Sequence, residues 1–130
     1  MRDYLFRGKR KDNGEWVEGC GIIATENWVS IFTVIDDIDE NSSEVNEIEV
    51  LPSTVGQYTG LTDKNGKKIF EGDIVKIIDD YDYIDIEVVK WSENDAGFFL
   101  EINDYYVEFD RVVAKECEVI GNIYNDTEER

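Results

Sequence analysis

The chain has 130 residues, of which 31 are Asp or Glu and 13 are Lys or Arg, so its formal net charge is −18, and it contains no histidine. This length suits one domain or two small subdomains that share a core. The charge argues against free nucleic acid as a partner, because phosphate binding needs clustered Lys and Arg, and the absence of histidine excludes Ser-His-Asp and Cys-His catalytic pairs.

The first predicted element is a hairpin near the N-terminus. Residues 6–19, FRGKRKDNGEWVEG, place an Asn-Gly pair among apolar and aromatic residues, and this pair favours a tight β-turn. A strand is predicted next at residues 28–35, WVSIFTVI, because this run is short and rich in β-branched and aromatic residues. These patterns indicate a small β-rich N-terminal region.

An acidic segment follows at residues 36–50. Its sequence, DDIDENSSEVNEIEV, carries seven acids and no base and lacks a clean apolar period. We therefore predict a mobile acidic loop there. This loop ends an N-terminal β-rich region of residues 1–51 and precedes a second domain at residues 52–130. At most one short helical turn fits the pattern, near residues 53–58 or near the C-terminus.

Residues 57–75, QYTGLTDKNGKKIFEGDIV, form the most informative stretch of the chain. Asn65-Gly66 predicts a type I′ hairpin turn, which needs positive φ at both central residues. Asp73 then opens a predicted strand at residues 73–78. The pattern echoes residues 6–19, so two hairpins of the same kind are expected. A phosphate-binding loop is not favoured, because its glycines would lead into a helix and these lead into strands.

Three further strands are predicted in the second half of the chain, at residues 84–91, 97–102 and 117–124. The first of them begins by alternating apolar and charged residues, as a half-buried strand does. It grows out of a second acidic run, at residues 79–87, which begins as a loop. No segment continues for the roughly ten residues expected of a helix, so the sequence predicts a mainly β protein.

The aromatic residues fall into two groups. Trp16, Trp28 and Trp91 lie in predicted strands, where packing in the core is expected. Four tyrosines lie instead among acids in or beside loops, where tyrosine often marks a protein-contact surface. The alternative for these four is partial burial at the edge of the core. The candidate contact residues are Tyr81, Tyr83, Tyr105 and Tyr106.

No catalytic, cofactor-binding or metal-binding residue is predicted. Cys20 and Cys117 are too far apart in sequence for a CxxC zinc motif, and free structural thiols are favoured over a disulfide. A calcium-like string begins at Asp37 but fails, because Ser42 stands where the turn glycine belongs and Ile48 where the bidentate Glu belongs. A solvated acidic loop is therefore favoured over a calcium site.

The few basic residues gather around predicted turns. One basic cluster lies at residues 7–11 and the other at residues 64–68. Solvated hairpin tips explain both clusters, and a phosphate site is the alternative.

Three motifs of the chain resemble the YopX family of bacteriophage and prophage proteins. They are FRGKRKDNGEWVEG at 6–19, TVGQYTGLTDKNGKKIFEGDIV at 54–75 and VIGNIY at 119–124, and their order and spacing match over nearly the whole chain. The resemblance implies an SH3-like β-barrel in the C-terminal part, at residues 52–130, preceded by a smaller β-rich region. It also implies a phage or prophage gene expressed in the cytoplasm of a bacterial host. It implies no activity and no catalytic residue.

Three functional hypotheses follow. The first is a non-enzymatic module that binds a host or phage protein with a basic surface, toward which an acidic surface would steer it. The second is a DNA mimic that inhibits a nucleic-acid-binding protein, and the third is a metal-dependent enzyme that uses clustered carboxylates. We expect no signal peptide, because the N-terminal sequence MRDYLFRGKRK has no apolar h-region. No membrane partner is expected either, because no apolar run approaches the roughly 20 residues of a membrane span. Exposed edges of a β-barrel would allow a homo-oligomer, but nothing in the sequence indicates one.

Overall fold

The computed structural model describes residues 4–36 and 43–125. The chain divides into two compact units, Met1–Gln57 and Tyr58–Arg130. The prediction of a mainly β protein is confirmed, since 58% of the residues lie in strands and 6% in helices. The domain limits expected from the sequence, 1–51 and 52–130, stay a prediction.

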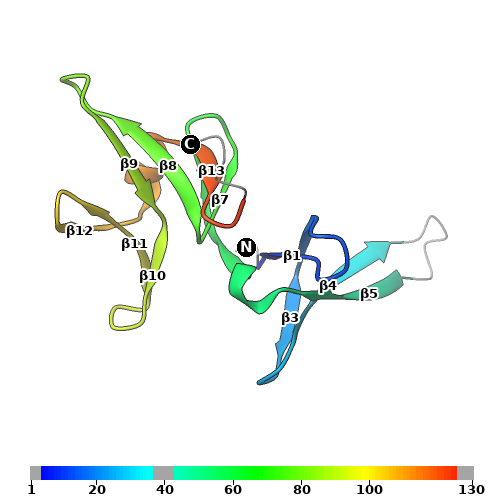
Figure 1. The fold of residues 1–130 in the computed structure, drawn as a ribbon. Coiled ribbons are helices and arrows are strands. Elements are labelled where there is room, and N and C mark those ends of the chain that lie inside the picture. The colour runs from blue at the N-terminus through cyan, green and yellow to red at the C-terminus, as the bar shows by residue number, and fades with distance from the viewer. Residues whose placement is uncertain (1–3, 37–42, 126–130) are drawn as a thin grey trace. The chain divides into compact units, whose positions relative to one another are not determined.

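The first unit is built from short antiparallel strands and one 3-10 turn (Figure 1). These elements are β1 (Phe6–Lys9), β2 (Trp16–Gly19), β3 (Gly21–Ala24), β4 (Val29–Asp36), β5 (Ser43–Val50), η1 (Pro52–Thr54) and the start of β6 (Gly56–Thr62). The strand β1 pairs with β2 on one side and with the start of β6 on the other. The strands β3, β4 and β5 form a second sheet in that order. The predicted N-terminal hairpin is therefore β1–β2, and the strand predicted at 28–35 is β4.

The core of the first unit is built on β4 and the end of β5. Val29, Ile31 and Val50 are each at most 8% exposed. Gly19 passes so close to β4 that a Cβ on it would contact the Phe32 carbonyl oxygen and lie 2.5 Å from Ile31 Cγ2. Packing against β4 therefore requires a glycine at this position.

The prediction of a loop at residues 36–50 is wrong for Asp36, which ends β4, and for residues 43–50, which form β5 and pair with β4 along its whole length. Glu47 and Glu49 are exposed, whereas Ile48 is half-buried and Val50 is buried. A strand can carry many acids when they occupy its solvent face. Residues 37–42 lie outside the described part of the chain.

The second unit consists of short strands and one helical turn. They are the end of β6, β7 (Lys68–Phe70), β8 (Asp73–Ile78), β9 (Ile84–Val88), β10 (Lys90–Ser92), β11 (Gly97–Ile102), β12 (Tyr105–Glu108), α1 (Arg111–Ala114) and β13 (Cys117–Asn122). Two antiparallel sheets have the orders β13-β8-β9 and β10-β11-β12, and β6 pairs with β7 (Figure 1). The strands predicted at 73–78 and 97–102 match β8 and β11 residue for residue.

The core of the second unit takes residues from most of its elements. These residues are Ile69, Val75, Val89, Leu100, Phe109, Ala114 and Cys117. Val89 divides the strand predicted at 84–91 into β9 and β10, because its side chain is buried and its N–H donates to the Asp73 carbonyl over 2.9 Å. No closed barrel is found among the described residues, so the SH3-like arrangement is not confirmed.

Both Asn-Gly pairs lie in hairpin turns, but the predicted type I′ geometry is wrong. Gly14 and Gly66 have φ of +73° and +82°, whereas the asparagine before each glycine does not have positive φ. In the second turn the Asp63 carboxylate accepts hydrogen bonds from the N–H groups of Asn65, at 2.8 Å, and Lys67, at 2.9 Å. The preceding acid therefore shapes this turn, which the Asn-Gly signal alone does not show.

Two buried acids hold the central motif together. Asp63 is 5% exposed and also accepts the Val119 N–H over 2.9 Å, a bond that joins residues 56 positions apart. Asp73 is 1% exposed and accepts the Phe70 N–H over 2.7 Å, which closes the turn into β8. Charge-assisted bonds of this kind are strong when they are shielded from water. The stretch 57–75 is therefore a structural element, and its glycines are turn residues that lead into strands.

The described residues form two helical turns, one more than was predicted. At most one turn was predicted, near residues 53–58 or near the C-terminus, whereas η1 overlaps the first of these places and α1 adds a second turn in the C-terminal part of the chain. Asp110 begins α1 by accepting the Val113 N–H over 3.0 Å. This is the usual role of aspartate at a helix N-cap.

The expectation that the three tryptophans pack in the core is wrong. Trp16 and Trp28 are half-buried, and Trp91 is 39% exposed. The Arg7 guanidinium lies 5.0 Å from the Trp16 ring centroid, and the Phe98 ring lies 5.0 Å from Trp91. Each of these two indoles therefore packs beside a neighbouring side chain at the edge of its sheet, where it keeps contact with solvent.

Both cysteines are free thiols, as predicted. Cys117 is buried, its Sγ donates to the Val113 carbonyl over 3.2 Å, and burial followed by the charges of Glu116 and Asp63 raises its pKa to about 12. Cys20 is exposed. Only Cys117 therefore fits the predicted structural role.

Candidate protein-contact surface

The β8–β9 hairpin ends in a tight turn that presents two of the four candidate tyrosines. The Asp79 carboxylate accepts hydrogen bonds from the N–H groups of Tyr81, at 2.8 Å, and Tyr83, at 2.9 Å. The Asp79 N–H donates to the Tyr83 carbonyl over 3.0 Å, and Asp82 takes the left-handed position with φ of +65°. These bonds repeat those of the Asp63 turn, so short-range chemistry holds the tip in one shape.

Both tyrosine side chains at this tip lie in solvent. Tyr81 is 83% exposed and Tyr83 is 71% exposed. The tip extends beyond the neighbouring strands of its unit (Figure 1). This exposure meets the first requirement of a contact surface, and the role itself stays a prediction.

Isoleucine side chains continue the exposed surface along the hairpin. Ile78 and Ile84 are directly opposite each other, and they are 47% and 56% exposed. Ile86 follows on the same face of β9 and is also 56% exposed. Asp85 and Glu87, on the other face, are half-buried. The charged face of this strand is thus more shielded than its apolar face, whereas an ordinary amphipathic strand buries its apolar face. The sequence missed these isoleucines, because alternation separates two faces without showing which one is covered.

The more shielded face of β9 lies against β11 of the neighbouring sheet. Burial first, and then the charge of Asp85, raise the pKa of Glu87, while Lys90 opposes the rise and Glu101 adds to it. Lys90 and Glu101 form an ion pair with an N–O distance of 3.7 Å. Charged side chains therefore occupy the side of β9 that faces β11, and the isoleucines are left toward solvent.

The other two candidate tyrosines lie on β12, in the second sheet of the unit. Tyr105 is 76% exposed and Tyr106 is 46% exposed. Tyr106 stacks on Phe99 with ring centroids 4.7 Å apart, and burial, followed by a hydrogen bond with Asp95, raises its pKa. In the described part of the chain, no ring contact joins this pair to the tyrosines of the hairpin tip. The structure thus presents two separate pairs, and Tyr106 fits the alternative of partial burial.

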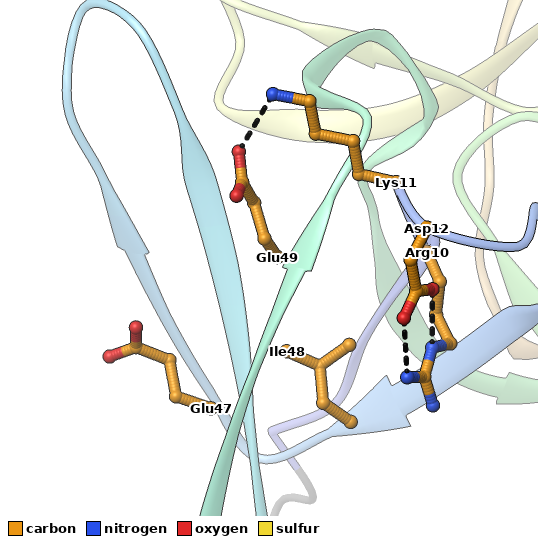
Figure 2. Close-up of a pocket in the computed structure, with 6 residues that line it drawn as sticks. All are labelled: Arg10, Lys11, Asp12, Glu47, Ile48 and Glu49. Atoms are coloured by element: carbon orange, nitrogen blue, oxygen red, sulfur yellow. Dashed lines mark hydrogen bonds and ion pairs between the residues drawn. The ribbon is translucent and has the colours of Figure 1, made fainter.

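A pocket of the first unit offers a second candidate site. It has a volume of about 330 Å³ and is lined by Arg10, Lys11, Asp12, Glu47, Ile48 and Glu49. Figure 2 shows the Arg10 guanidinium facing Asp12 and Lys11 reaching Glu49, with N–O distances of 2.9 and 3.2 Å. The hydrogen bond from Arg10 lowers the pKa of Asp12. Acids of the same pocket therefore neutralise both of its cations, and we assign it no ligand.

The described residues contain neither a metal-binding cluster nor a membrane-spanning helix. Their Cys, Asp and Glu side chains form no group of three or more that could hold a metal ion. The calcium-like string that begins at Asp37 has its first positions among residues 37–42, outside the described residues. No helix in the described part of the chain has the length and apolar character needed to cross a membrane.

The sequence and the fold both match known proteins. A family model described as YopX protein matches residues 5–129. The chain belongs to the YopX family. The crystal structure of protein EF1440 from Enterococcus faecalis matches the YopX chain with a TM-score of 0.62 and 22% identity, over 95% of this chain and 94% of that one. At this identity the likeness shows a shared fold alone, and no curated protein matches.

Proposed function

We propose that this YopX protein is a non-enzymatic interaction module that binds another protein through its β8–β9 hairpin. The observation that carries the proposal is the hairpin surface, an exposed group of apolar and aromatic side chains on one hairpin. It consists of Ile78, Tyr81, Tyr83, Ile84 and Ile86. Contiguous exposed apolar residues mark interaction sites on soluble proteins, and tyrosine is enriched in such sites.

The bonds within the hairpin tip support this role. The Asp79 carboxylate binds the backbone N–H groups of Tyr81 and Tyr83, so the backbone that carries both rings is already ordered. A surface that is ordered before binding loses less conformational entropy when a partner docks. The tip is thus suited to bind without rearrangement of its backbone.

Acids around the hairpin surface define the chemistry of the partner. Asp80 and Asp82 are exposed at the tip, and the whole chain has a net charge of −18. An apolar centre with an acidic rim complements an apolar patch bordered by Lys and Arg. A field of this sign also speeds the encounter with a basic protein. The proposed partner is therefore a host or phage protein with a basic surface.

The family resemblance supports the remaining parts of the proposal. On that ground we place the protein in the cytoplasm of a bacterial host, as the product of a phage or prophage gene, and expect an SH3-like arrangement in its second unit. A non-enzymatic role is favoured because the sequence has no histidine and no recognisable nucleophile–base pair. Fold alone does not define function, so the hairpin surface carries the proposal.

The test uses three forms of the full chain as bait in lysate of a bacterial host. They are the unaltered chain, the double variant Tyr81→Ser/Ile84→Ser and the control Val112→Ser, whose side chain is 72% exposed on α1. Thermal melting checks that all three forms fold, and mass spectrometry identifies the bound proteins. We expect one basic partner that the unaltered chain and the Val112 variant retain and that the double variant loses.

Retention of the partner by all three forms would contradict the hairpin surface as the binding site. If duplex DNA then displaces that partner from the double variant and high salt removes it, the chain acts as a DNA mimic instead. Its net charge of −18 equals that of roughly 30 Å of duplex, at about one charge per 1.7 Å.

A further inference from the structure

The second unit contains a pocket that only cationic and uncharged residues line. Its volume is about 260 Å³, and its lining residues are Gly60, Leu61, Thr62, Arg111 and Lys115. No carboxylate is among them, in contrast to the pocket of Figure 2, where acids neutralise the cations. We call this site the basic pocket.

A bulge in β6 forms one side of the basic pocket. Tyr58 pairs with Phe70 and Thr62 pairs with Lys68, so three residues of β6 lie opposite a single residue of β7. Gly60, in the middle of this bulge, has φ of +87°. Extra residues of this kind bend a strand out of its ladder, and bulges recur beside functional sites. The strand therefore departs from regular pairing where it borders Arg111 and Lys115.

Further cations flank the basic pocket on the β6–β7 hairpin. Lys68 lies opposite Thr62 in the register, and the Lys64 N–H donates to the Cys117 carbonyl over 3.0 Å, close in sequence to Lys115. With Lys67, five of the 13 basic residues of the chain either line the pocket or lie on the hairpin that borders it. All five side chains are exposed: Lys64, Lys67, Lys68, Arg111 and Lys115.

Within the described residues, none of these five cations forms an ion pair, whereas both cations of the Figure 2 pocket do. Three acids lie close to these cations in the sequence. Asp63 is buried and its charge interacts with that of Lys67, whereas Asp110 and Glu116 are exposed next to Arg111 and Lys115. Among the described residues, Arg111 and Lys115 therefore line the pocket without an ion pair to a carboxylate.

We propose that the basic pocket binds the phosphate group of a small phosphorylated molecule. The Arg111 guanidinium offers paired N–H donors, Lys115 offers a mobile positive charge, and the Thr62 hydroxyl offers a further donor. The volume lies just below the roughly 300 Å³ at which drug-sized pockets begin, so it suits one phosphate and part of its carrier. A long polyanion fits less well, because the chain as a whole has a net charge of −18 and would repel it.

Nuclear magnetic resonance of the ¹⁵N-labelled full chain tests this site. Inorganic phosphate, glycerol phosphate and adenosine monophosphate are titrated separately at constant pH and at an ionic strength held constant with sodium chloride. The site variant is Arg111→Gln/Lys115→Gln. The matched control is Arg10→Gln/Lys11→Gln, which removes the same charge from the pocket of Figure 2. All four altered positions belong to exposed or half-buried side chains, so both variants keep the core intact.

We expect saturable shifts of the amides at residues 60–62 and 111–115. The affinity should fall about tenfold or more in the site variant and stay unchanged in the control, because charge-assisted bonds are lost only in the former. A tighter response to adenosine monophosphate than to phosphate assigns a nucleotide ligand, and an equal response assigns the phosphate group alone. Shifts that do not saturate, or that persist equally in both variants, overturn the proposal. A single-stranded oligonucleotide that binds more tightly than the mononucleotide, with steep salt dependence, overturns it in favour of nucleic acid.

Discussion

The hairpins β1–β2 and β6–β7 both turn at an Asn-Gly pair, but the two turns differ in their backbone hydrogen bonds and in their settings. Each turns at an Asn-Gly pair with a left-handed glycine and with open space where a Cβ would point. In the first turn, the exposed Asn13 side chain accepts the N–H of Glu15 over 2.9 Å. In the second, the buried Asp63 binds its own turn and also Val119, on a strand far away in sequence. Local sequence makes both turns, and a long-range bond makes one of them central to the fold.

The Glu-Gly steps that follow the two hairpins differ in a similar way. Gly19 is required because its backbone lies against Ile31 and Phe32. Gly72 has φ of +90°, and a Cβ there would lie 2.7 Å from the Tyr124 ring. Glycine is thus needed for close packing in the first unit and mainly for its positive φ in the second.

The largest contrast is expected between Asp63→Ala and Asn13→Ala. Loss of the Asp63 carboxylate leaves three backbone N–H groups without their acceptor, so the free energy of unfolding should fall by about 3–5 kcal/mol. Asn13→Ala removes one exposed turn bond and should cost about 0.5–1 kcal/mol. Urea denaturation of the full chain measures both values, and equal losses would contradict the difference between the two turns.

A smaller effect is expected for Gly19→Ala, at about 1–3 kcal/mol, because the added methyl group overpacks the contact with β4. Gly21→Ala is the matched control on the next strand, since its Cβ would lie 3.7 Å from the Phe32 Cβ, an ordinary contact. The control should change the free energy of unfolding by less than about 0.5 kcal/mol. A tolerated alanine at position 19 would show that β4 moves aside.

Gly66→Val should lower stability by about 1–3 kcal/mol, because a β-branched residue resists positive φ. Gly14→Val should cost a similar amount, since both glycines are left-handed and neither Cβ would meet another atom. Thermal melting compares the two variants. An unchanged midpoint for either would mean that its turn does not need a left-handed residue.

The pH dependence of stability offers a finer test of Asp63. Burial raises the pKa of Asp63, but its bonds to the N–H groups of Val119, Lys67 and Asn65 together outweigh burial, so the net pKa lies below 3.8. A carboxyl group with a lowered folded pKa stabilises the fold above its unfolded pKa, and this contribution is lost as pH falls through the folded pKa. The stability gap between the unaltered chain and Asp63→Asn should therefore be full near about pH 7 and narrow below about pH 4. A gap that stays constant with pH would indicate that Asp63 is not ionised.

The two thiols can be compared by their reactivity in the folded chain, without a measurement of stability. Cys20 is exposed and should react readily with a thiol reagent, whereas the pKa of about 12 leaves Cys117 with almost no thiolate. We expect one labelled thiol in the folded protein and two after unfolding, with none in the folded Cys20→Ser variant. Rapid labelling of Cys117 in the folded chain would mean that the core around it opens.

Local sequence patterns predicted much of the fold and part of the candidate surface. The strands β8 and β11 were predicted residue for residue, because β-branched and aromatic runs end at Gly, Asn or Asp. The strand β5 was missed, since only Ile48 and Val50 are apolar on its more buried face and acids are frequent along the segment. Acid-rich loops located Tyr81 and Tyr83, but the isoleucines beside them appeared as ordinary core positions.

By itself, the sequence determined the family, the mainly β class and the positions of the two Asn-Gly turns. Only the tertiary structure decided that the isoleucine face of β9 meets solvent, that Asp63 joins a turn to β13, and that residues 60–62 and 111–115 line one pocket. Periodicity and turn chemistry depend on residues a few positions apart, so one chain segment contains them. Burial and charge clustering depend on which elements pack together. These elements are roughly 50 residues apart in the sequence, so a local pattern does not show that they are in contact.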